Sequence, residues 1–320
     1  MQYAIGIDIG GTKISLVIGN SQGKIMTRHV LETQKGARAE QSVRNIIDHV
    51  EALIRESKAP RKKILGIGIG IPGPVDSEKG IVPRSPHMTG WTGISLGPIL
   101  SRKLKLPVFM TNDANAAALG EKMFGEGRRE KHFVYLTIST GIGGGLVSNG
   151  QLIEGASFMG GEVGHMKIVA GGRKCKCGKL GCLEAYASGT AIASFAAEAM
   201  GKGKRSTLRG FMAKNRKLSA KEVGLAAQNG DRLALEVFKI AGFYLGVGIS
   251  NLLHLVNPGM VVLGGGVLKS SPPIFWKSMI ESCKRASWSP AFQAVRIQRS
   301  RLKDKVGDLG ALALVFEKLG

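Results

Sequence analysis

Three cysteines and one histidine form the most specific group of chemically competent residues in this chain. Cys175, Cys177 and Cys182 fall within eight residues, and His165 precedes the first of them by ten. Three thiolates and one imidazole complete a closed tetrahedral shell for Zn²⁺, which is typical of a structural site. Buried free cysteines are the alternative, but this segment is rich in glycine and lysine and would make a poor core. We therefore predict a structural zinc ion bound by these four residues.

Two carboxylates flank this cluster. Glu162 precedes His165 by three residues, and Glu184 follows Cys182 by two. A bound metal would fix the backbone that carries both acids and so organise a polar pocket, although a pair of solvated acids is the simpler interpretation. Carboxylates and an imidazole together suit a ligand with many hydroxyl groups.

A second polar pair, Asn112 and Asp113, stands between an apolar strand and an alanine-rich helix. Either residue can cap that helix, and a cap needs only one of them. A catalytic role would use both, with the amide holding a hydroxyl group and the carboxylate accepting its proton as phosphoryl transfer begins. The sequence leaves both roles open.

Three glycine-rich turns follow predicted strands. They are Asp8–Lys13, Ser139–Gly145 and Gly264–Gly266. Without Cβ atoms, main-chain N–H groups can approach phosphate oxygens, and a carboxylate beside them suits magnesium. The first turn alone does not distinguish a phosphate site from an ordinary hairpin, because many hairpins turn through two glycines and an aspartate can cap such a turn. Two facing turns of this kind could hold one polyphosphate group.

The elements that must position these residues form an α/β pattern. We predict strands at 3–9, 14–18, 64–71, 108–110, 133–138, 146–147 and 260–263, and helices at about 39–58, 189–200, 219–228, 231–256 and 307–318. The strand, glycine turn and strand near residue 5 recur near residue 134, so we expect two related halves that face each other across a cleft. The expected domains are 1–118, completed by a final helix at about 307–320, and 119–306, which carries the zinc site.

Length and composition set the remaining expectations. A chain of 320 residues is long enough for two domains. We see no apolar run near the ~18 residues of a membrane span and no secretory leader, so we expect a cytoplasmic protein without a membrane partner. The formal charge of +22 fits a basic, solvated surface, with ATP steering or polyanion binding as alternatives. The basic residues are scattered with few aromatics between them, so we expect no specific nucleic-acid partner.

Together these motifs resemble the ROK family of bacterial sugar kinases and related repressors over nearly the whole chain. The matching segments, in the family's order, are Ile7–Lys13, Gly70–Val75, Asn112–Asn115, Gly161–His165 and Cys175–Glu184. The resemblance implies an actin-like (ribonuclease-H-like) fold with nucleotide and sugar in the interdomain cleft. It also implies transfer of the γ-phosphate of magnesium-ATP to a hexose hydroxyl, and a homodimer or homotetramer.

The resemblance also implies roles for individual residues. Asp113 would be the general base, and Asp8 would hold Mg²⁺ through water. The implied sugar ligands are Gly73, Asn112, Asp113, Glu162, His165 and Glu184. The implied residues on the nucleotide side are Asp8, Gly10, Gly11, Thr12, Lys13, Thr140, Gly141, Gly264, Gly265 and Gly266.

Two positions depart from the family pattern. His87 stands where many family glucokinases have asparagine, and Ser139 stands where glycine is frequent. Glucose is the first choice of substrate, but N-acetylglucosamine, N-acetylmannosamine, fructose and allose fit the same motifs, and polyphosphate could replace ATP. A catalytically idle sugar sensor or a transcription regulator is the alternative of another class. Family repressors carry a helix-turn-helix region before the core, which here would have to precede residue 3, so we do not expect a DNA-binding repressor.

Overall fold

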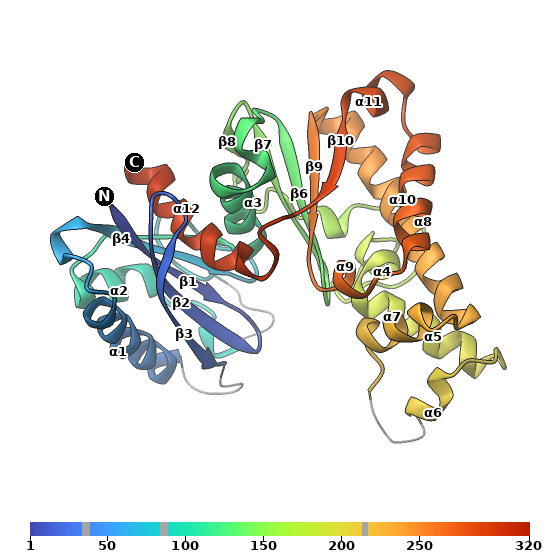
Figure 1. Cartoon of the computed structure of the whole chain (residues 1–320), viewed down its shortest axis with the longest axis horizontal. Helices are drawn as coiled ribbons and strands as arrows, with labels where there is room; N and C mark the ends of the chain where they lie inside the picture. Colours follow the sequence, from blue (N-terminus) through green and yellow to red (C-terminus); the bar gives the residue numbers. More distant parts are fainter. Residues whose placement is uncertain (34–38, 84–88, 213–216) are drawn as a thin grey trace. The chain divides into compact units, whose positions relative to one another are not determined.

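The computed structural model describes residues 1–33, 39–83, 89–212 and 217–320. The chain divides into two compact units (Figure 1). Unit 1 comprises Met1–Lys131, Gly145–Gly161 and Ser300–Gly320, and unit 2 comprises His132–Gly144 and Glu162–Arg299. Compared with the division expected from the sequence, unit 1 also holds residues 119–131, 145–161 and 300–306.

Unit 1 is built on a five-stranded mixed sheet with the order β3-β2-β1-β4-β5. The strands are β1 (Tyr3–Ile9), β2 (Lys13–Asn20), β3 (Ile25–Glu32), β4 (Ile64–Ile71) and β5 (Val108–Asn112). The first three strands form an antiparallel meander, whereas β4 and β5 run parallel to β1. Because parallel strands share one carboxyl edge, the residues that follow β1, β4 and β5 come together at that edge.

Helices cover both faces of this sheet. They are α1 (Ala39–Ser57), α2 (Leu96–Leu104), α3 (Asp113–Phe124) and α12 (Val306–Leu319). Alternate residues of β1 explain the two layers: Ile5, Ile7 and Ile9 pack with α1 and α2, while Ala4 packs with α12. At Gly68 a Cβ would lie 1.9 Å from Ala311 O, so glycine allows α12 to pack directly on β4.

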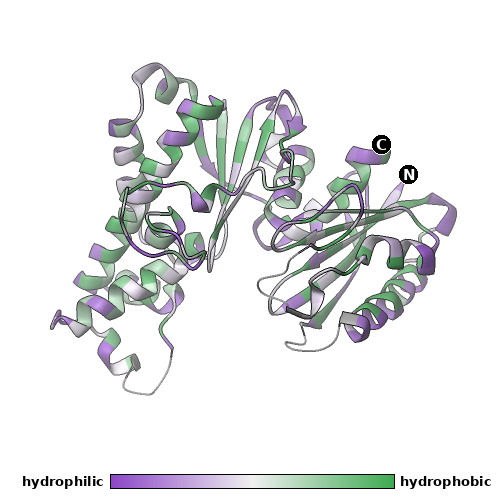
Figure 2. Cartoon of the chain, turned by 180° about the vertical axis from the view of Figure 1, so that it is seen from behind, coloured by the Kyte–Doolittle hydropathy of each residue, from purple (hydrophilic) through white to green (hydrophobic). Residues whose placement is uncertain are grey.

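Unit 2 contains most of a second five-stranded sheet, with the order β10-β9-β6-β7-β8. The strands are β6 (Phe133–Ile138), β7 (Ile142–Ser148), β8 (Gln151–Leu152), β9 (Met260–Gly264) and β10 (Arg296–Arg299). The boundary between the units falls inside β7. Strand β9 runs parallel to both β6 and β10, and its five residues are all buried. In Figure 2 the strands are largely hydrophobic, and hydrophilic residues collect on the outer sides of the helices.

The helices of unit 2 follow one another along the chain after β8. They are α4 (Glu184–Ala187), α5 (Gly189–Gly201), α6 (Leu208–Met212), α7 (Ala220–Gln228), α8 (Arg232–Val256), α9 (Val267–Ser270), α10 (Pro273–Ala286) and α11 (Ser289–Ala294). Side-chain caps set three of the starts: Ser188 caps α5, Ser219 forms a capping box with Glu222 on α7, and Asp231 caps α8.

Helix α8 corrects one expectation from the sequence. Among the described helices it is long and apolar enough to cross a membrane by length and composition, so the statement that no stretch approaches this size was wrong. Its apolar residues are mostly buried, and it packs closely on α10, where a Cβ at Gly242 would lie 2.3 Å from Phe275 O. The core helix of a soluble protein passes the same test.

The other predicted elements are present with shifts of a few residues at their ends. The predicted final helix is α12, which belongs to unit 1 and packs on β1. The sequence patterns did not predict β3, β8, β10 and α10, nor the short helices α4, α6, α9 and α11.

Candidate functional site

The first glycine turn joins β1 to β2 and is fixed by hydrogen bonds. Gly10 N donates to Lys13 O at 2.8 Å, and Thr33 Oγ1 donates to Gly10 O at 2.7 Å. Thr33 N also donates to Thr12 O at 3.0 Å, so a residue that the sequence did not single out holds the turn. Gly11 is exposed, and a Cβ there would meet nothing within 4 Å. The main chain at Gly11 is therefore open to a phosphate group.

Asp8 lies beside this turn in a crowded acidic environment. Burial, followed by the negative charges of Asp113 and Asp308, raises the pKa of its carboxyl group from 3.8 to about 7. The first turn of α12 approaches so closely that a Cβ at Gly307 would lie 2.2 Å from Asp8 Oδ2. These carboxylates fit a divalent cation with oxygen ligands, such as Mg²⁺, because the cation would relieve their repulsion and favour the ionised form.

Gly307 and Asp308 did not appear among the predicted site residues. Asp308 is almost fully buried, its Oδ2 lies 3.1 Å from Arg28 Nε, and Arg28 Nε also donates to Ser15 Oγ at 3.0 Å. The ion pair connects α12 to β3, and the hydrogen bond connects β3 to β2. An acid among the apolar residues of the last helix was the signal in the sequence that could have identified Asp308.

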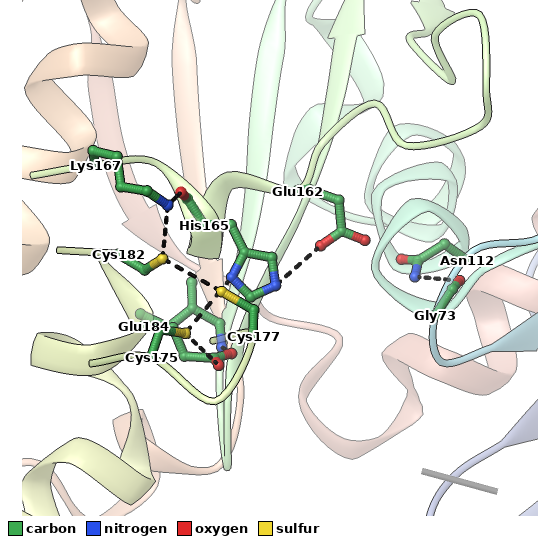
Figure 3. Close-up of polar contacts among 10 residues, drawn as sticks. Gly73, Asn112, Glu162, His165, Lys167, Cys175, Cys177, Cys182 and Glu184 are labelled. Carbon is green, nitrogen blue, oxygen red and sulfur yellow. Dashed lines mark hydrogen bonds and ion pairs between the residues drawn. The ribbon is translucent and has the colours of Figure 1, made fainter. Parts of the chain in front are cut away.

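Asn112 and Asp113 lie at the junction of β5 and α3. Asn112 is the N-cap, with Oδ1 accepting from Ala114 N at 2.9 Å and Nδ2 donating to Gly73 O at 3.1 Å (Figure 3). Asp113 Oδ1 also accepts from Ala114 N, at 2.8 Å. Because Ile71 and Asn112 are partners on parallel strands, the turn at Gly73 comes beside Asn112. The structure thus brings together three predicted sugar ligands, Gly73, Asn112 and Asp113. It also shows Asn112 in the capping role at the start of α3.

The second and third glycine turns lie together within unit 2. Gly265 has a φ of +99°, and a Cβ there would lie 2.3 Å from Ile138 O, at the end of β6. The start of α5 holds the second turn, because Thr190 Oγ1 donates to Thr140 O at 2.8 Å. Ser139, the departure from the family pattern, keeps the turn intact, with its N–H donating to Gly141 O at 2.9 Å. Two of the three predicted phosphate turns are therefore neighbours.

The four predicted metal ligands converge. The side-chain donor atoms of His165, Cys175, Cys177 and Cys182 all lie within 4.8 Å of one another. Cys177 Sγ and Cys182 Sγ are 3.7 Å apart, and His165 Nδ1 lies 3.8 Å from Cys175 Sγ (Figure 3). Tetrahedral coordination with Zn–S bonds of about 2.3 Å separates two sulfurs by about 3.8 Å. The donor set and its spacing therefore fit zinc.

Both predicted acids of unit 2 lie beside this cluster. Glu162 Oε2 is 3.9 Å from His165 Nε2, the ring nitrogen that faces away from the sulfurs. Glu184 Oε2 accepts from Ile142 N at 3.0 Å, and its Oε1 lies 3.8 Å from Cys175 Sγ. Glu184 therefore links the cysteine cluster to the second glycine turn, a structural contact that the sequence did not predict.

The predicted site residues thus form two groups, one in each unit. The group in unit 1 contains Asp8, Gly10, Gly11, Thr12, Lys13, Gly73, Asn112 and Asp113, and the group in unit 2 contains Thr140, Gly141, Glu162, His165, Cys175, Cys177, Cys182, Glu184 and Gly264–Gly266. His87 lies outside the described residues. The expected cleft between two domains stays a prediction.

Comparisons with known proteins identify the family of this chain. Residues 4–318 match the ROK family. The glucokinase of Thermotoga maritima is 35% identical over 99% of this chain and 98% of its own length. The xylose repressor of Caldicellulosiruptor bescii is 32% identical over 98% of this chain and 78% of the repressor.

A solved structure with a similar fold is the ROK hexokinase from Thermus thermophilus. It superposes with a TM-score of 0.85 and 33% identity, and the match covers 99% of both chains. The actin-like α/β fold that the resemblance implies is thereby confirmed. The structure builds it on two five-stranded sheets. On this evidence the chain is a member of the ROK family.

Proposed function

We propose that this protein is a cytoplasmic sugar kinase that transfers the γ-phosphoryl group of ATP to a hydroxyl of a hexose, with glucose as the first candidate. The observation that carries the proposal is that Asn112 and Asp113 stand next to each other at the end of β5. The negative charge of Asp113 also helps to raise the pKa of Asp8 in the same unit. The amide of Asn112, which donates to Gly73 O, can hold a hydroxyl group, and the carboxylate of Asp113 beside it can accept the proton of that hydroxyl group. Two relatives named glucokinase, which this chain matches over 82% and 98% of their lengths, support the same activity.

Each group of residues has a part in this proposal. Asp113 accepts the proton of the sugar hydroxyl, and Asn112 and the main chain at Gly73 orient the sugar. Asp8 holds the metal of magnesium-ATP through water, and the turn at Gly11 offers N–H groups to phosphate oxygens. When bound, magnesium disperses negative charge on the phosphoryl group that is transferred.

Unit 2 supplies the remaining contacts in the proposal. The turns at Thr140–Gly141 and Gly264–Gly266 lie beside the nucleotide, while Glu162, His165 and Glu184 bind sugar hydroxyls. The metal proposed for the cluster of three cysteines and His165 is Zn²⁺, because three sulfurs and an imidazole at tetrahedral spacing suit that ion. The zinc has a structural role, since the four protein ligands leave no open position.

A sugar-responsive regulator is the second candidate, since the xylose repressor match covers nearly all of this chain. Release of ADP from ATP, measured with and without each of a panel of hexoses, N-acetylhexosamines and xylose, separates the two. A kinase releases ADP only in the presence of its sugar and forms a sugar phosphate in equal amount. Saturable sugar binding with no ADP above background for every sugar would refute the kinase and favour the regulator.

A further inference from the structure

We propose that Lys167 neutralises the charge of the cysteine cluster and protects its sulfurs from electrophiles, which slows loss of the metal. The proposal rests on the zinc assignment made above. It concerns a residue that none of the sequence motifs singled out.

Lys167 contacts two of the proposed metal ligands at once. Its Nζ lies 2.9 Å from Cys182 Sγ and 2.9 Å from His165 O (Figure 3). Cys182 is fully buried, whereas the lysine is exposed. The positively charged side chain of the exposed Lys167 thus contacts the sulfur of Cys182, which is shielded from water.

The backbone sets this contact. Lys167 and Cys182 are partners in an antiparallel bridge. The bridge is extended by hydrogen bonds from Leu183 N to Met166 O and from Ile168 N to Gly181 O, both 2.9 Å long. Residues directly opposite each other on antiparallel strands place their side chains on the same face. The ammonium group is therefore held near the sulfur by main-chain pairing as well as by its own hydrogen bonds.

The positive charge of Lys167 offsets the negative charge of the metal-bound cysteine cluster. Three thiolates, a neutral imidazole and a divalent ion carry a net charge of about −1. An uncompensated charge near the protein interior is unfavourable, and one ammonium group brings the total to zero. A charge-assisted N–H···S bond also withdraws electron density from the sulfur, which makes it a poorer nucleophile.

Two other basic side chains of the loop, Lys176 and Arg173, have different partners. Lys176 Nζ donates to Thr190 Oγ1 at 3.4 Å. Arg173 forms an ion pair with Glu198. Lys176 therefore offers a matched control, because it lies between two of the cysteines and carries the same charge but donates to a hydroxyl group.

The test compares Lys167→Met, which keeps an unbranched side chain without the charge, with Lys167→Arg, which keeps the charge, and with Lys176→Met. Each protein is first shown to contain one zinc ion per chain by metal analysis. N-ethylmaleimide is then added, and the zinc released is followed with a chromogenic chelator. In this reaction the electron pair of the Cys177 sulfur, which is exposed and shares the charge of the cluster with Cys182, forms an S–C bond to the maleimide. The enolate formed takes a proton from water, and the Zn–S bond breaks.

We expect Lys167→Met to release zinc about tenfold faster than the unmodified protein, a typical effect of removing a partner that contacts a metal ligand. Lys167→Arg and Lys176→Met should stay within about twofold of the unmodified protein, because charge at the sulfur is kept in both. A purely structural role would not alter sulfur electron density. In the cobalt-substituted proteins, the sulfur-to-cobalt charge-transfer band should therefore shift in Lys167→Met alone.

Equal release rates for Lys167→Met and the unmodified protein, or an equal acceleration in Lys176→Met, would overturn the proposal. If Lys167→Met does not fold, Lys167→Gln, which can still donate to His165 O, takes its place with the same expectations. Absence of zinc from the unmodified protein would refute the metal assignment itself. Unchanged rates in zinc-loaded variants would refute only the role of Lys167.

Discussion

The Nε2 atom of His165 lies 3.9 Å from the carboxylate of Glu162, while the other ring nitrogen faces the sulfur of Cys175. One imidazole ring therefore connects the cysteine cluster to an acid proposed to bind the sugar. A metal ligand commonly uses its second ring nitrogen for a hydrogen bond that fixes the orientation of the ring. In this protein a sugar hydroxyl can take that place, so zinc and sugar affinity should be linked.

Replacing His165 tests this link. His165→Ala should lower the zinc content and raise the KM for the sugar together, because the same ring serves both. Cys175→Ser should act on the sugar only indirectly, through the loosened loop and the contact between Cys175 and Glu184. Metal analysis and calorimetric titration with sugar and with ATP, before and after chelation, provide the measurements. Full sugar affinity in verified zinc-free protein would contradict the link.

The high pKa of Asp8 predicts an unusual pH dependence of stability. The folded protein keeps this proton up to about pH 7, whereas the unfolded chain loses it near the ordinary value of 3.8. Between these values the native state binds more protons, so the contribution of Asp8 to the free energy of unfolding falls as pH rises. Asp8→Asn should therefore raise Tm at pH 7.5, with a gain that fades as the pH approaches 4, and Mg²⁺ should stabilise only the unmodified protein.

Scanning calorimetry across this pH range, with and without Mg²⁺, measures the effect. The kinetic counterpart is a weaker response of Asp8→Asn to magnesium with sugar binding retained. A Tm difference that is constant with pH, or a magnesium dependence that is unchanged, would show that Asp8 does not have this role.

Gly307 should be needed for the position of Asp8. Alanine normally favours a helix over glycine by about 1 kcal/mol. A Cβ at this position would lie 2.2 Å from Asp8 Oδ2, so we expect the carboxylate to be displaced. Gly307→Ala should raise the KM for magnesium-ATP severalfold with little change in sugar KM.

The control is Gly201→Ala in α5, where a Cβ would meet nothing within 4 Å. That variant should leave both KM values unchanged. An unaltered KM for magnesium-ATP in a folded Gly307→Ala protein would mean that the close approach of α12 to Asp8 has no functional consequence.

The formal charge of +22 leads to a prediction about salt. If the basic surface steers ATP, the KM for ATP should rise several-fold as ionic strength increases from about 0.01 M to 0.15 M, since the Debye length then falls from about 30 Å to about 8 Å. The uncharged sugar provides an internal control, because its KM should not respond. A flat KM for ATP would show that the charge plays no part in binding the phosphate donor.

The sequence predicted the elements whose apolar patterns are strong. Strand β4 is nearly all isoleucine and glycine and is buried, so its apolar run was unambiguous. Strand β3 is an edge strand in which every second residue is exposed, and the polar and charged residues Thr27, Arg28 and His29 hid its alternation. Helix α10 begins with a proline and has one buried face, signals that were available and were overlooked.

Contacts between distant segments explain what the site prediction lacked. The metal cluster could be predicted because its ligands are close in sequence. Gly307 and Lys167 could not be, because their roles depend on where α12 packs and on which residue faces Cys182. Only the fold brings residue 307 beside residue 8.

Asp113→Asn separates a catalytic role from a structural one. The replacement keeps size and shape, and α3 remains capped because Asn112 Oδ1 still accepts from Ala114 N. Loss of the basic oxygen should lower kcat by at least ~10² with sugar affinity largely retained, the usual range for removal of a general base. Near-normal turnover would exclude Asp113 as the base.

Transfer of phosphate from ATP to a sugar is tested most directly by phosphorus-31 NMR of the purified protein with magnesium-ATP and the best sugar of the panel. The prediction is a sugar phosphate resonance that grows in step with ADP, is absent without sugar, and is slowed by at least ~10² in Asp113→Asn. ATP that stays intact beside a bound sugar, or ADP that forms with free phosphate and no sugar phosphate, would contradict the assignment of a sugar kinase.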